Sequence, residues 1–187
     1  MAFLDAQSRT VLFDPPDVYE EALARYALSA EDIAFARAHR RSHNRLGFAI
    51  QLALVRDLGR PLRAGEVPPQ AIVSVVADQL GIDAAVFALY AQREETRREH
   101  TREIVVALDL QPVRASDYRS LITAAAREAA ATEQGEPITK AVIEALKERK
   151  LLVPVPELLI RLAMAGRAAA RRQAYRGLIR GMEQPSI

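Results

Sequence analysis

The chain contains no cysteine and no tryptophan, and only 5% of its 187 residues are aromatic. The lack of cysteine excludes disulfides, thiol catalysis and cysteine-based metal sites. No apolar run reaches the roughly 18 residues that a membrane span requires, and the first residues show no basic segment followed by an apolar one, as a signal peptide would. We therefore expect a cytoplasmic protein that has no membrane partner.

The residues that are abundant favour helices. Half of the chain is hydrophobic, alanine and leucine dominate, and there are only eight glycines, a mixture typical of helical proteins. Capping residues and apolar periodicity predict helices at 15–26, 29–40, 42–58, 68–80, 83–91, 93–108, 116–132, 137–150 and 157–182. This pattern predicts an all-α, multi-helical fold of two small bundles with helix-turn-helix-like elements.

The break at Gln111-Pro112-Val113 marks the expected domain boundary. We expect a first helical domain at 1–110, which would bind DNA, and a second helical domain at 111–187 that ends in a long basic helix. Within the first domain, the stretch 46–55 is apolar on almost every side, which predicts a central buried helix.

Acidic residues are missing from two long windows, 33–56 and 158–182. The first window holds five arginines and two of the three histidines, and the second holds six arginines. Residues 1–32 carry a net charge of −5, although the whole chain is at +2. Cations without nearby carboxylates create a positive field, and its commonest partner is a phosphate backbone. An acidic N-terminal segment followed by a basic remainder is typical of a protein that binds nucleic acid with one face.

The segment Arg37–Arg45 concentrates this charge where one expected helix ends and the next begins. Such a turn can direct several donors at a nucleic acid, and the N–H groups of the new helix also favour phosphate. Arginines at a helix C-terminus can simply complement its dipole. That explains Arg40 and Arg41, but not Asn44 and Arg45 in the first turn of the next helix. Asn and Arg are also suited to bidentate reading of bases, so the segment predicts DNA contact.

The last helix repeats arginines on one face. Arg172, Arg176 and Arg180 are four residues apart, and Arg161 lies on nearly the same face. Such like charges repel one another, and a negatively charged partner would offset the repulsion. DNA is one such partner. The alternative is a helical protein-interaction or dimerisation module, in which this helix docks on an acidic surface or on a second copy.

Other chemistry lacks the residues that it needs. His39 and His43 are spaced to share one helix face, as in zinc helices, but arginines surround them and no acidic residue is near. No serine lies in a nucleophile elbow and no glycine-rich phosphate loop occurs. We therefore expect no catalytic residue, no metal, no cofactor and no small-molecule substrate. The charges of 93–108 alone are typical of a solvated, salt-bridged face.

The block His43–Leu52, with Arg40 and Arg41 before it, resembles the N-terminal region of the Tn-three family of replicative transposases. Further segments resemble that region in the same order: 25–32, 67–69, 76–81, 90–104, 145–154 and 158–170. The resemblance covers nearly the whole chain. It implies a helical region that binds double-stranded DNA at the terminal inverted repeats of a transposon.

The resemblance also implies which residues contact DNA. They are Arg40, Arg41, His43, Asn44 and Arg45, joined by Arg93, Thr96, Arg97, Arg98 and His100. Asp57 departs from the family pattern, because we expect a neutral or basic residue at that position. The chain ends far short of the RNase H-like domain whose carboxylates hold the catalytic metal ions. We therefore expect a non-catalytic part of a transposase.

Overall fold

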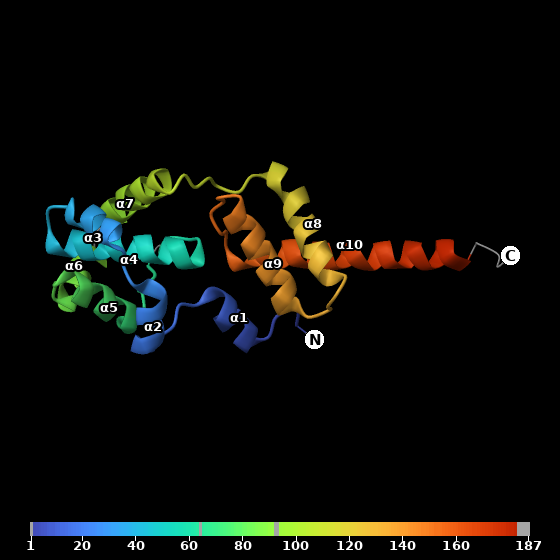
Figure 1. The fold of residues 1–187 in the computed structure, drawn as a ribbon, viewed down its shortest axis with the longest axis horizontal. Helices are drawn as coiled ribbons and strands as arrows, with labels where there is room; N and C mark the ends of the chain where they lie inside the picture. The colour runs from blue at the N-terminus through green and yellow to red at the C-terminus, as the bar shows by residue number, and fades with distance from the viewer. Residues whose placement is uncertain (1, 64, 92–93, 183–187) are drawn as a thin grey trace. The chain divides into compact units, whose positions relative to one another are not determined.

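The computed structural model describes residues 2–63, 65–91 and 94–182 (Figure 1). Within these ranges the chain forms α-helices and two short 3-10 helices and no β-strand, which confirms the all-α prediction. The chain divides into two compact units, which we describe separately. We call residues 14–111 the continuous unit, and residues 2–13 together with 112–182 the split unit. The sequence had grouped residues 1–13 with the first domain, whereas Leu4 and Phe13 are buried in the core of the split unit.

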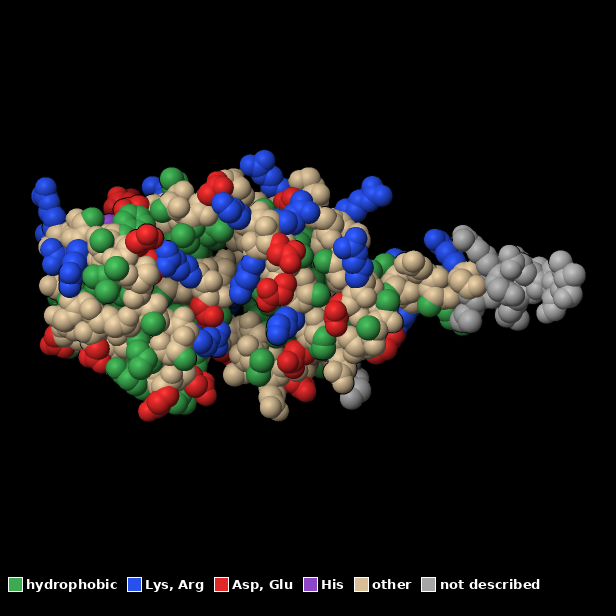
Figure 2. All heavy atoms as spheres, viewed as in Figure 1, with side chains coloured by type: hydrophobic (Ala, Val, Ile, Leu, Met, Phe, Trp, Pro, Cys, Tyr) green, Lys and Arg blue, Asp and Glu red, His purple; other side chains and the backbone are tan. Residues whose placement is uncertain are grey.

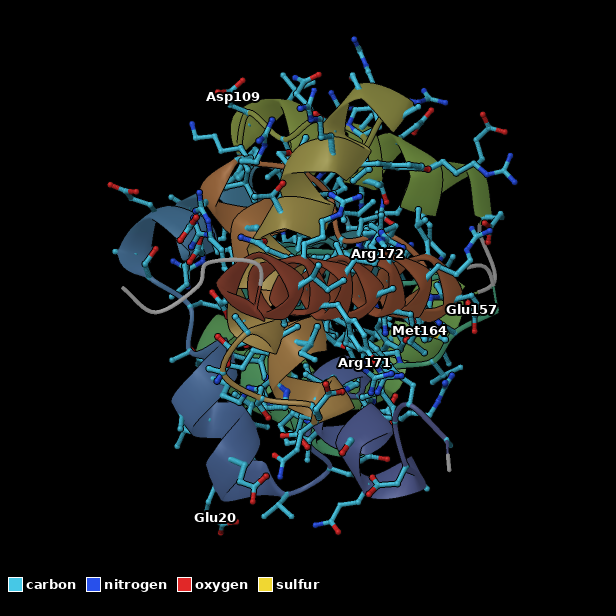
Figure 3. All side chains as sticks on the ribbon, turned by 90° about the vertical axis from the view of Figure 1, so that its right-hand side faces the viewer. Glu20, Asp109, Glu157, Met164, Arg171 and Arg172 are labelled. Carbon is cyan, nitrogen blue, oxygen red and sulfur yellow. The ribbon has the colours of Figure 1, made fainter. Side chains whose placement is uncertain are left out.

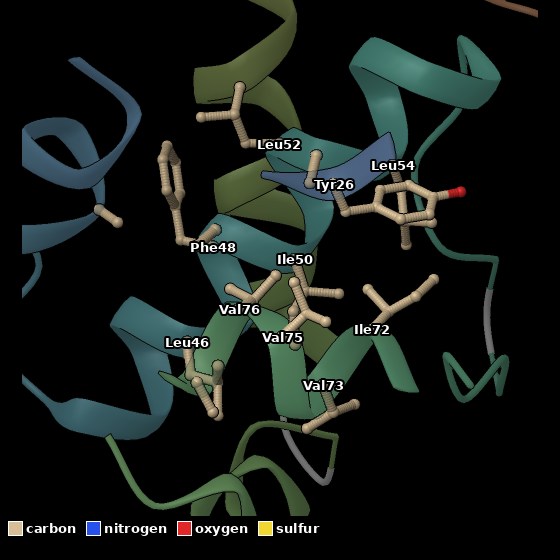
Figure 4. Packing of buried hydrophobic residues seen from close by; sticks show 14 of the residues in the cluster. Tyr26, Leu46, Phe48, Ile50, Leu52, Leu54, Ile72, Val73, Val75 and Val76 are labelled. Atoms are coloured by element: carbon tan, nitrogen blue, oxygen red, sulfur yellow. The ribbon is translucent and has the colours of Figure 1, made fainter. Parts of the chain in front are cut away.

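The continuous unit is built around one buried helix. Its helices are α2 (Tyr19–Tyr26), α3 (Ala30–Arg37), α4 (Ser42–Leu58), α5 (Gln70–Leu80), α6 (Phe87–Ala91) and α7 (Glu94–Ala107), with a 3-10 turn at Ala84–Val86. Every residue of Leu46–Val55 in α4 is buried, as its apolar sequence predicts. Figure 4 shows how Phe48 and Ile50 of α4 lie among Ile72 and Val76 of α5. The helix ends at Gly59, whose positive φ of 70° favours glycine.

A capping box opens α3. The Ser29 hydroxyl accepts a hydrogen bond from the Asp32 amide at 3.1 Å, and the Asp32 carboxylate accepts from the Ser29 amide at 2.9 Å. Asp32 also pairs with Arg56 of α4, so the cap ties α3 to the central helix. The helix ends at Arg37, earlier than the predicted Arg40, which leaves residues 38–41 as the connection to α4.

The split unit contains α1 (Ala6–Phe13), α8 (Tyr118–Ala129), α9 (Gly135–Glu148) and α10 (Pro156–Met182), with a 3-10 turn at Ala115–Asp117. The sequence did not predict α1, which begins where the Ser8 amide donates to the Asp5 carboxylate at 2.7 Å. Leu121, Ile138 and Leu159 form the core with no exposed surface. A Cβ at Gly166 of α10 would lie 2.3 Å from Ala125 Cβ, so glycine allows α10 to approach α8 closely.

The last helix, α10, continues past the helices that support it. Its 27 residues give a rod of ~40 Å at 1.5 Å per residue, and its outer half extends beyond α8 and α9 in Figure 1. The side chains of residues 171–176 are all exposed. No single helix in the described ranges has both the length and the apolar character to cross a membrane; α5 and the segment Ala84–Tyr90 meet those criteria only jointly, across a bend of 117°.

Candidate nucleic-acid interface

The turn between α3 and α4 presents the predicted arginines to solvent. Arg37, Arg40 and Arg41 are exposed, and none has an ion-pair partner among the described residues. Arg41 occupies the N-cap of α4, and its side chain makes no capping hydrogen bond. The first intrahelical bond runs from the Arg45 amide to the Arg41 carbonyl at 2.9 Å. The N–H groups before it have no acceptor within the helix, so three guanidinium groups adjoin a helix terminus that favours anions.

The other predicted residues of this turn are half-buried. Arg45 donates from Nε to the His39 carbonyl at 2.6 Å, which fixes its guanidinium group against the turn. Asn44 Oδ1 is buried and has no hydrogen-bond partner among the described residues. His43 is half-buried and already engaged in an interaction. The turn therefore has two parts: three exposed arginines, and the half-buried polar side chains of residues 43–45.

His39 joins the turn to α7. Its ring centroid lies 4.3 Å from that of Phe48 and 4.5 Å from that of His100. Its Nε2 atom lies 3.8 Å from a carboxylate oxygen of Glu103. These contacts hold α7 beside the turn, and they also bring one acidic side chain to the edge of the basic surface.

Two residues that the family resemblance assigned to DNA lie in the core instead. Arg97 is 6% exposed and donates from Nη2 to the carbonyls of Arg63 and Glu66, at 2.9 and 3.1 Å. His100 is 5% exposed. Its burial, and then the nearby His39, lower the pKa of His100 to about 4, so the ring is neutral at pH 7. Both side chains have internal partners and little accessible surface, so we remove them from the candidate interface.

A buried polar network explains why these residues are internal. Gln51 of α4 donates from Nε2 to the Tyr90 hydroxyl at 2.6 Å and to the Arg97 carbonyl at 3.1 Å. Thr101 donates to Gln51 Oε1 at 3.1 Å. The side-chain amide of Gln51 and the hydroxyls of Tyr90 and Thr101 thus have partners within this network, as buried polar groups require, and the network fixes α7 on α4. Charge pattern alone does not reveal it, because its members are far apart in the sequence.

The remaining residues of α7 contribute less than predicted. Thr96 is half-buried. Arg98 is exposed but lies 3.7 Å from Glu94, so part of its charge is compensated. Arg102, also exposed, has no ion-pair partner among the described residues. Arg93 lies outside the described residues. The turn, rather than α7, is the centre of the positive surface in the continuous unit.

The arginines of α10 fall into two groups. Arg171 pairs with Glu133 at 2.6 Å, and the hydrogen bond from Arg171 lowers the pKa of that carboxyl. Arg167 lies over the Phe3 ring, 4.6 Å from its centroid. In contrast, Arg161, Arg172 and Arg176 are exposed and have no ion-pair partner among the described residues. Figure 3 shows Arg171 and Arg172 on different sides of α10. The side chain of Arg180 lies outside the described residues.

A row of side chains on α8 was missed at the sequence level. Arg119, Thr123 and Arg127 are exposed and four residues apart, so they share one helix face. No acidic residue occurs from Tyr118 to Arg127. The sequence signal for this face is a short acid-free window, which is much shorter than those at 33–56 and 158–182. On the face shown in Figure 2, lysine and arginine side chains project over α8.

In the described part of the chain, no group of three or more histidine and acidic side chains could hold a metal ion. The exposed arginines offer positive charge and hydrogen-bond donors. Guanidinium groups in a fixed arrangement suit phosphate oxygens and the acceptor edges of bases.

Comparison with known proteins agrees with the family resemblance. Residues 3–166 match a family described as "Domain of unknown function (DUF4158)". The chain is 31% identical, over 94% of its length, to 18% of the transposase for transposon Tn501 from Pseudomonas aeruginosa. It is 30% identical, over 98% of its length, to 19% of the transposase for transposon Tn3926 from Escherichia coli. The chain thus spans about a fifth of the length of these relatives. The predicted resemblance to Tn-three-family transposases is confirmed.

Proposed function

Because the chain belongs to the DUF4158 domain family and is similar to transposases over most of its length, we propose that it is the DNA-binding, non-catalytic part of a transposase. It binds the terminal inverted repeats of a transposon as double-stranded DNA. Strand cutting and joining are carried out by the part of such proteins that this chain does not match.

One observation carries the proposal: Arg37, Arg40 and Arg41 are exposed and uncompensated beside the open N-terminus of α4. Three neighbouring cations repel one another unless a polyanion meets them. Helix N-termini and arginines are the usual protein contacts to phosphate oxygens. These side chains therefore supply affinity, largely independent of base sequence.

Base discrimination comes from the sheltered part of the turn. Asn44 and Arg45 carry the side-chain types that read adenine and guanine in the major groove, and Asn44 reads a base by turning outward its buried Oδ1, which has no hydrogen-bond partner among the described residues. The hydrogen bond from Arg45 to the His39 carbonyl limits the positions that its guanidinium can take, and a fixed donor discriminates better than a mobile one. Arg97 and His100 act on this site only by holding α7 in place.

The experiment is a binding titration on an inverted-repeat duplex at about 50 and about 200 mM salt. If roughly six phosphates are engaged, affinity falls by ~10³-fold between these conditions. The double variant Arg40→Ala/Arg41→Ala should bind weakly and show a shallower salt dependence. The control, Arg63→Ala, removes an exposed charge from the loop that follows α4, outside the turn between α3 and α4. Salt-independent binding, or equal losses in both variants, would contradict the proposal.

Specificity needs a separate comparison. Asn44→Ala should weaken binding to the inverted repeat more than to a duplex of random sequence, because a base contact is worth ~1–3 kcal/mol of discrimination. Arg41→Ala should weaken both to a similar degree, since it would remove a phosphate contact. Equal losses on the two duplexes for Asn44→Ala would rule out base reading by this residue.

A second candidate function rests on one face of α10. Met164, Tyr175 and Ile179 are 45%, 72% and 51% exposed, and their spacing puts them on one helix face. Exposed apolar side chains in a row favour a protein partner, so a dimerisation or docking helix remains the alternative. The mass of the protein in solution, with and without DNA, tests this. A dimer without DNA that Tyr175→Glu converts to a monomer would favour it.

A further inference from the structure

The exposed face of α8 forms a second positive surface, in the split unit. Arg119 and Arg127 flank Thr123 on this face, and eight residues of helix span ~12 Å, three to four steps of a DNA strand at ~3.4 Å each. Neither arginine has an ion-pair partner among the described residues. The Thr123 hydroxyl donates its proton to the Arg119 carbonyl at 2.8 Å, so the side chain between the two arginines is neutral and adds no carboxylate to the face.

The row continues onto α10. Thr123 and Arg127 line a hollow of about 740 Å³ together with Gln173 of α10. Gln173 also lines an adjoining hollow of about 580 Å³ together with Arg172 and Arg176. Arg127 of α8 thus borders one hollow, Arg172 and Arg176 of α10 border the other, and the neutral Gln173 borders both. We call Arg119, Thr123, Arg127, Arg172, Gln173 and Arg176 the α8–α10 surface.

The floor of this surface consists of short side chains. Ala126, Ala130, Ala170 and Ala174 line the larger hollow. Alanines offer a partner helix little apolar area to bury, and the aromatic and bulky side chains that anchor protein partners are absent from the described lining. The one acidic residue there, Glu133, is already paired with Arg171. The chemistry of the lining favours a polyanion over an apolar protein partner.

We propose that the α8–α10 surface binds the phosphodiester backbone of duplex DNA, as a contact separate from the turn between α3 and α4. Arg119, Arg127, Arg172 and Arg176 pair with phosphate oxygens, and the side-chain amide of Gln173 donates to the same strand. The inference rests on the proposed function and extends it, since each unit of the chain then carries its own DNA contact. Neither arginine of α8 belongs to the sites expected from the sequence.

The test uses the whole chain and a duplex of mixed sequence, about 40 base pairs long. Arg119→Gln/Arg127→Gln removes two charges and keeps good helix formers on an exposed face, so the fold is retained, which a thermal melt verifies. The slope of log affinity against log salt should become shallower by ~1.8, because each phosphate contact contributes ~0.9. Between about 50 and 200 mM salt, the variant should then lose about 12-fold less affinity than the parent. The control Lys140→Gln, an exposed cation on α9, should leave the slope unchanged.

The outcomes separate this inference from the proposed function. If the parent chain does not bind the duplex, both are overturned. If the parent binds and Arg40→Ala/Arg41→Ala weakens binding, but Arg119→Gln/Arg127→Gln keeps the slope of the Lys140→Gln control, only the α8–α10 surface is overturned. A shallower slope in both double variants, with additive losses in affinity, supports two separate contacts.

Discussion

The Tyr90 hydroxyl lies 3.2 Å from Nδ1 of His100, in the core of the continuous unit. Because Gln51 donates to the same hydroxyl at 2.6 Å, the tyrosine can donate its own proton to His100. Nδ1 then acts as an acceptor, and the imidazole carries its proton on Nε2. Burial raises the pKa of Tyr90 to about 12, so the phenol keeps its proton. Near pH 7 the Tyr90 phenol and the His100 imidazole are therefore both neutral.

This arrangement predicts how stability depends on pH. The pKa of His100 is about 4 in the folded chain and 6.5 in its ordinary state, so between these values the unfolded chain binds more protons. Stability is therefore full above about pH 6.5 and falls as the pH drops toward about 4, by up to ~3 kcal/mol from this residue. Urea midpoints across this range should fall less steeply for His100→Gln than for the parent. Parallel curves would contradict a neutral buried imidazole.

The Tyr90 ring also predicts the effect of a small change in α4. A Cβ at Gly47 would lie 2.2 Å from Tyr90 Cγ, so the ring has no room for a methyl group. Gly47→Ala should destabilise the chain by ~1–3 kcal/mol through overpacking, although alanine favours helices. Combining it with Tyr90→Leu should cost less than the sum of the two single changes, because the clash is removed. Additive losses in denaturant unfolding would show that the ring is not the obstacle.

Asp57 has a structural role near the C-terminal end of α4. Its carboxylate pairs with Arg25 at 2.6 Å and accepts the hydrogen bond of the Tyr26 hydroxyl, whose side chain is 1% exposed. Asp57→Ala should cost ~1–3 kcal/mol, because it leaves a buried hydroxyl without its acceptor. Arg25→Ala should cost less than ~1 kcal/mol, since it removes only a partly exposed ion pair. Chemical denaturation measures both, and a larger loss in Arg25→Ala would reverse this assignment.

Two glycines of α10 form a matched pair. Gly166 faces α8, where a Cβ would lie 2.3 Å from Ala125 Cβ and 2.9 Å from backbone atoms. At Gly177, no atom of the described residues lies within 4 Å of the same position. Gly166→Ala should destabilise the split unit by ~1–3 kcal/mol, whereas Gly177→Ala should stabilise the helix by up to ~1 kcal/mol. Thermal melts of the two variants should move in opposite directions, and a shift of the same sign in both would contradict the close approach of α8 and α10.

Local signals predicted most of the fold. The stretch Leu46–Val55 is apolar on almost every side, which predicts a buried helix, and every residue of this stretch is buried in α4. Ser29 and Asp32 gave the start of α3, and Gly59 gave the end of α4. These features are read from neighbouring residues alone. The helix α1 was missed because its capping residue, Asp5, precedes a stretch with weak periodicity, and its partners lie more than a hundred residues away, such as Glu136, which accepts a hydrogen bond from Ser8.

The candidate site was predicted less completely, and the reason is distance along the chain. The exposure of Arg37, Arg40 and Arg41 follows from their place at a helix junction. The burial of Arg97 depends on two carbonyls in the loop after α4, more than thirty residues earlier. The sequence shows that Arg97 carries a charge, but it does not show that distant backbone carbonyls will accept hydrogen bonds from its guanidinium group.

The split unit consists of two stretches of chain that the continuous unit separates. A protease cut after residue 13 would leave the two units joined through the connection at 111–112. A cut at 111–112 would leave residues 2–13 as the remaining tether, seated by Leu4, by Phe13 and by the hydrogen bond from Ser8 to Glu136. Cleavage of one of these two connections therefore does not separate the continuous unit from the split unit. After a cut at 111–112, the contacts of residues 2–13 determine how strongly the two fragments stay associated.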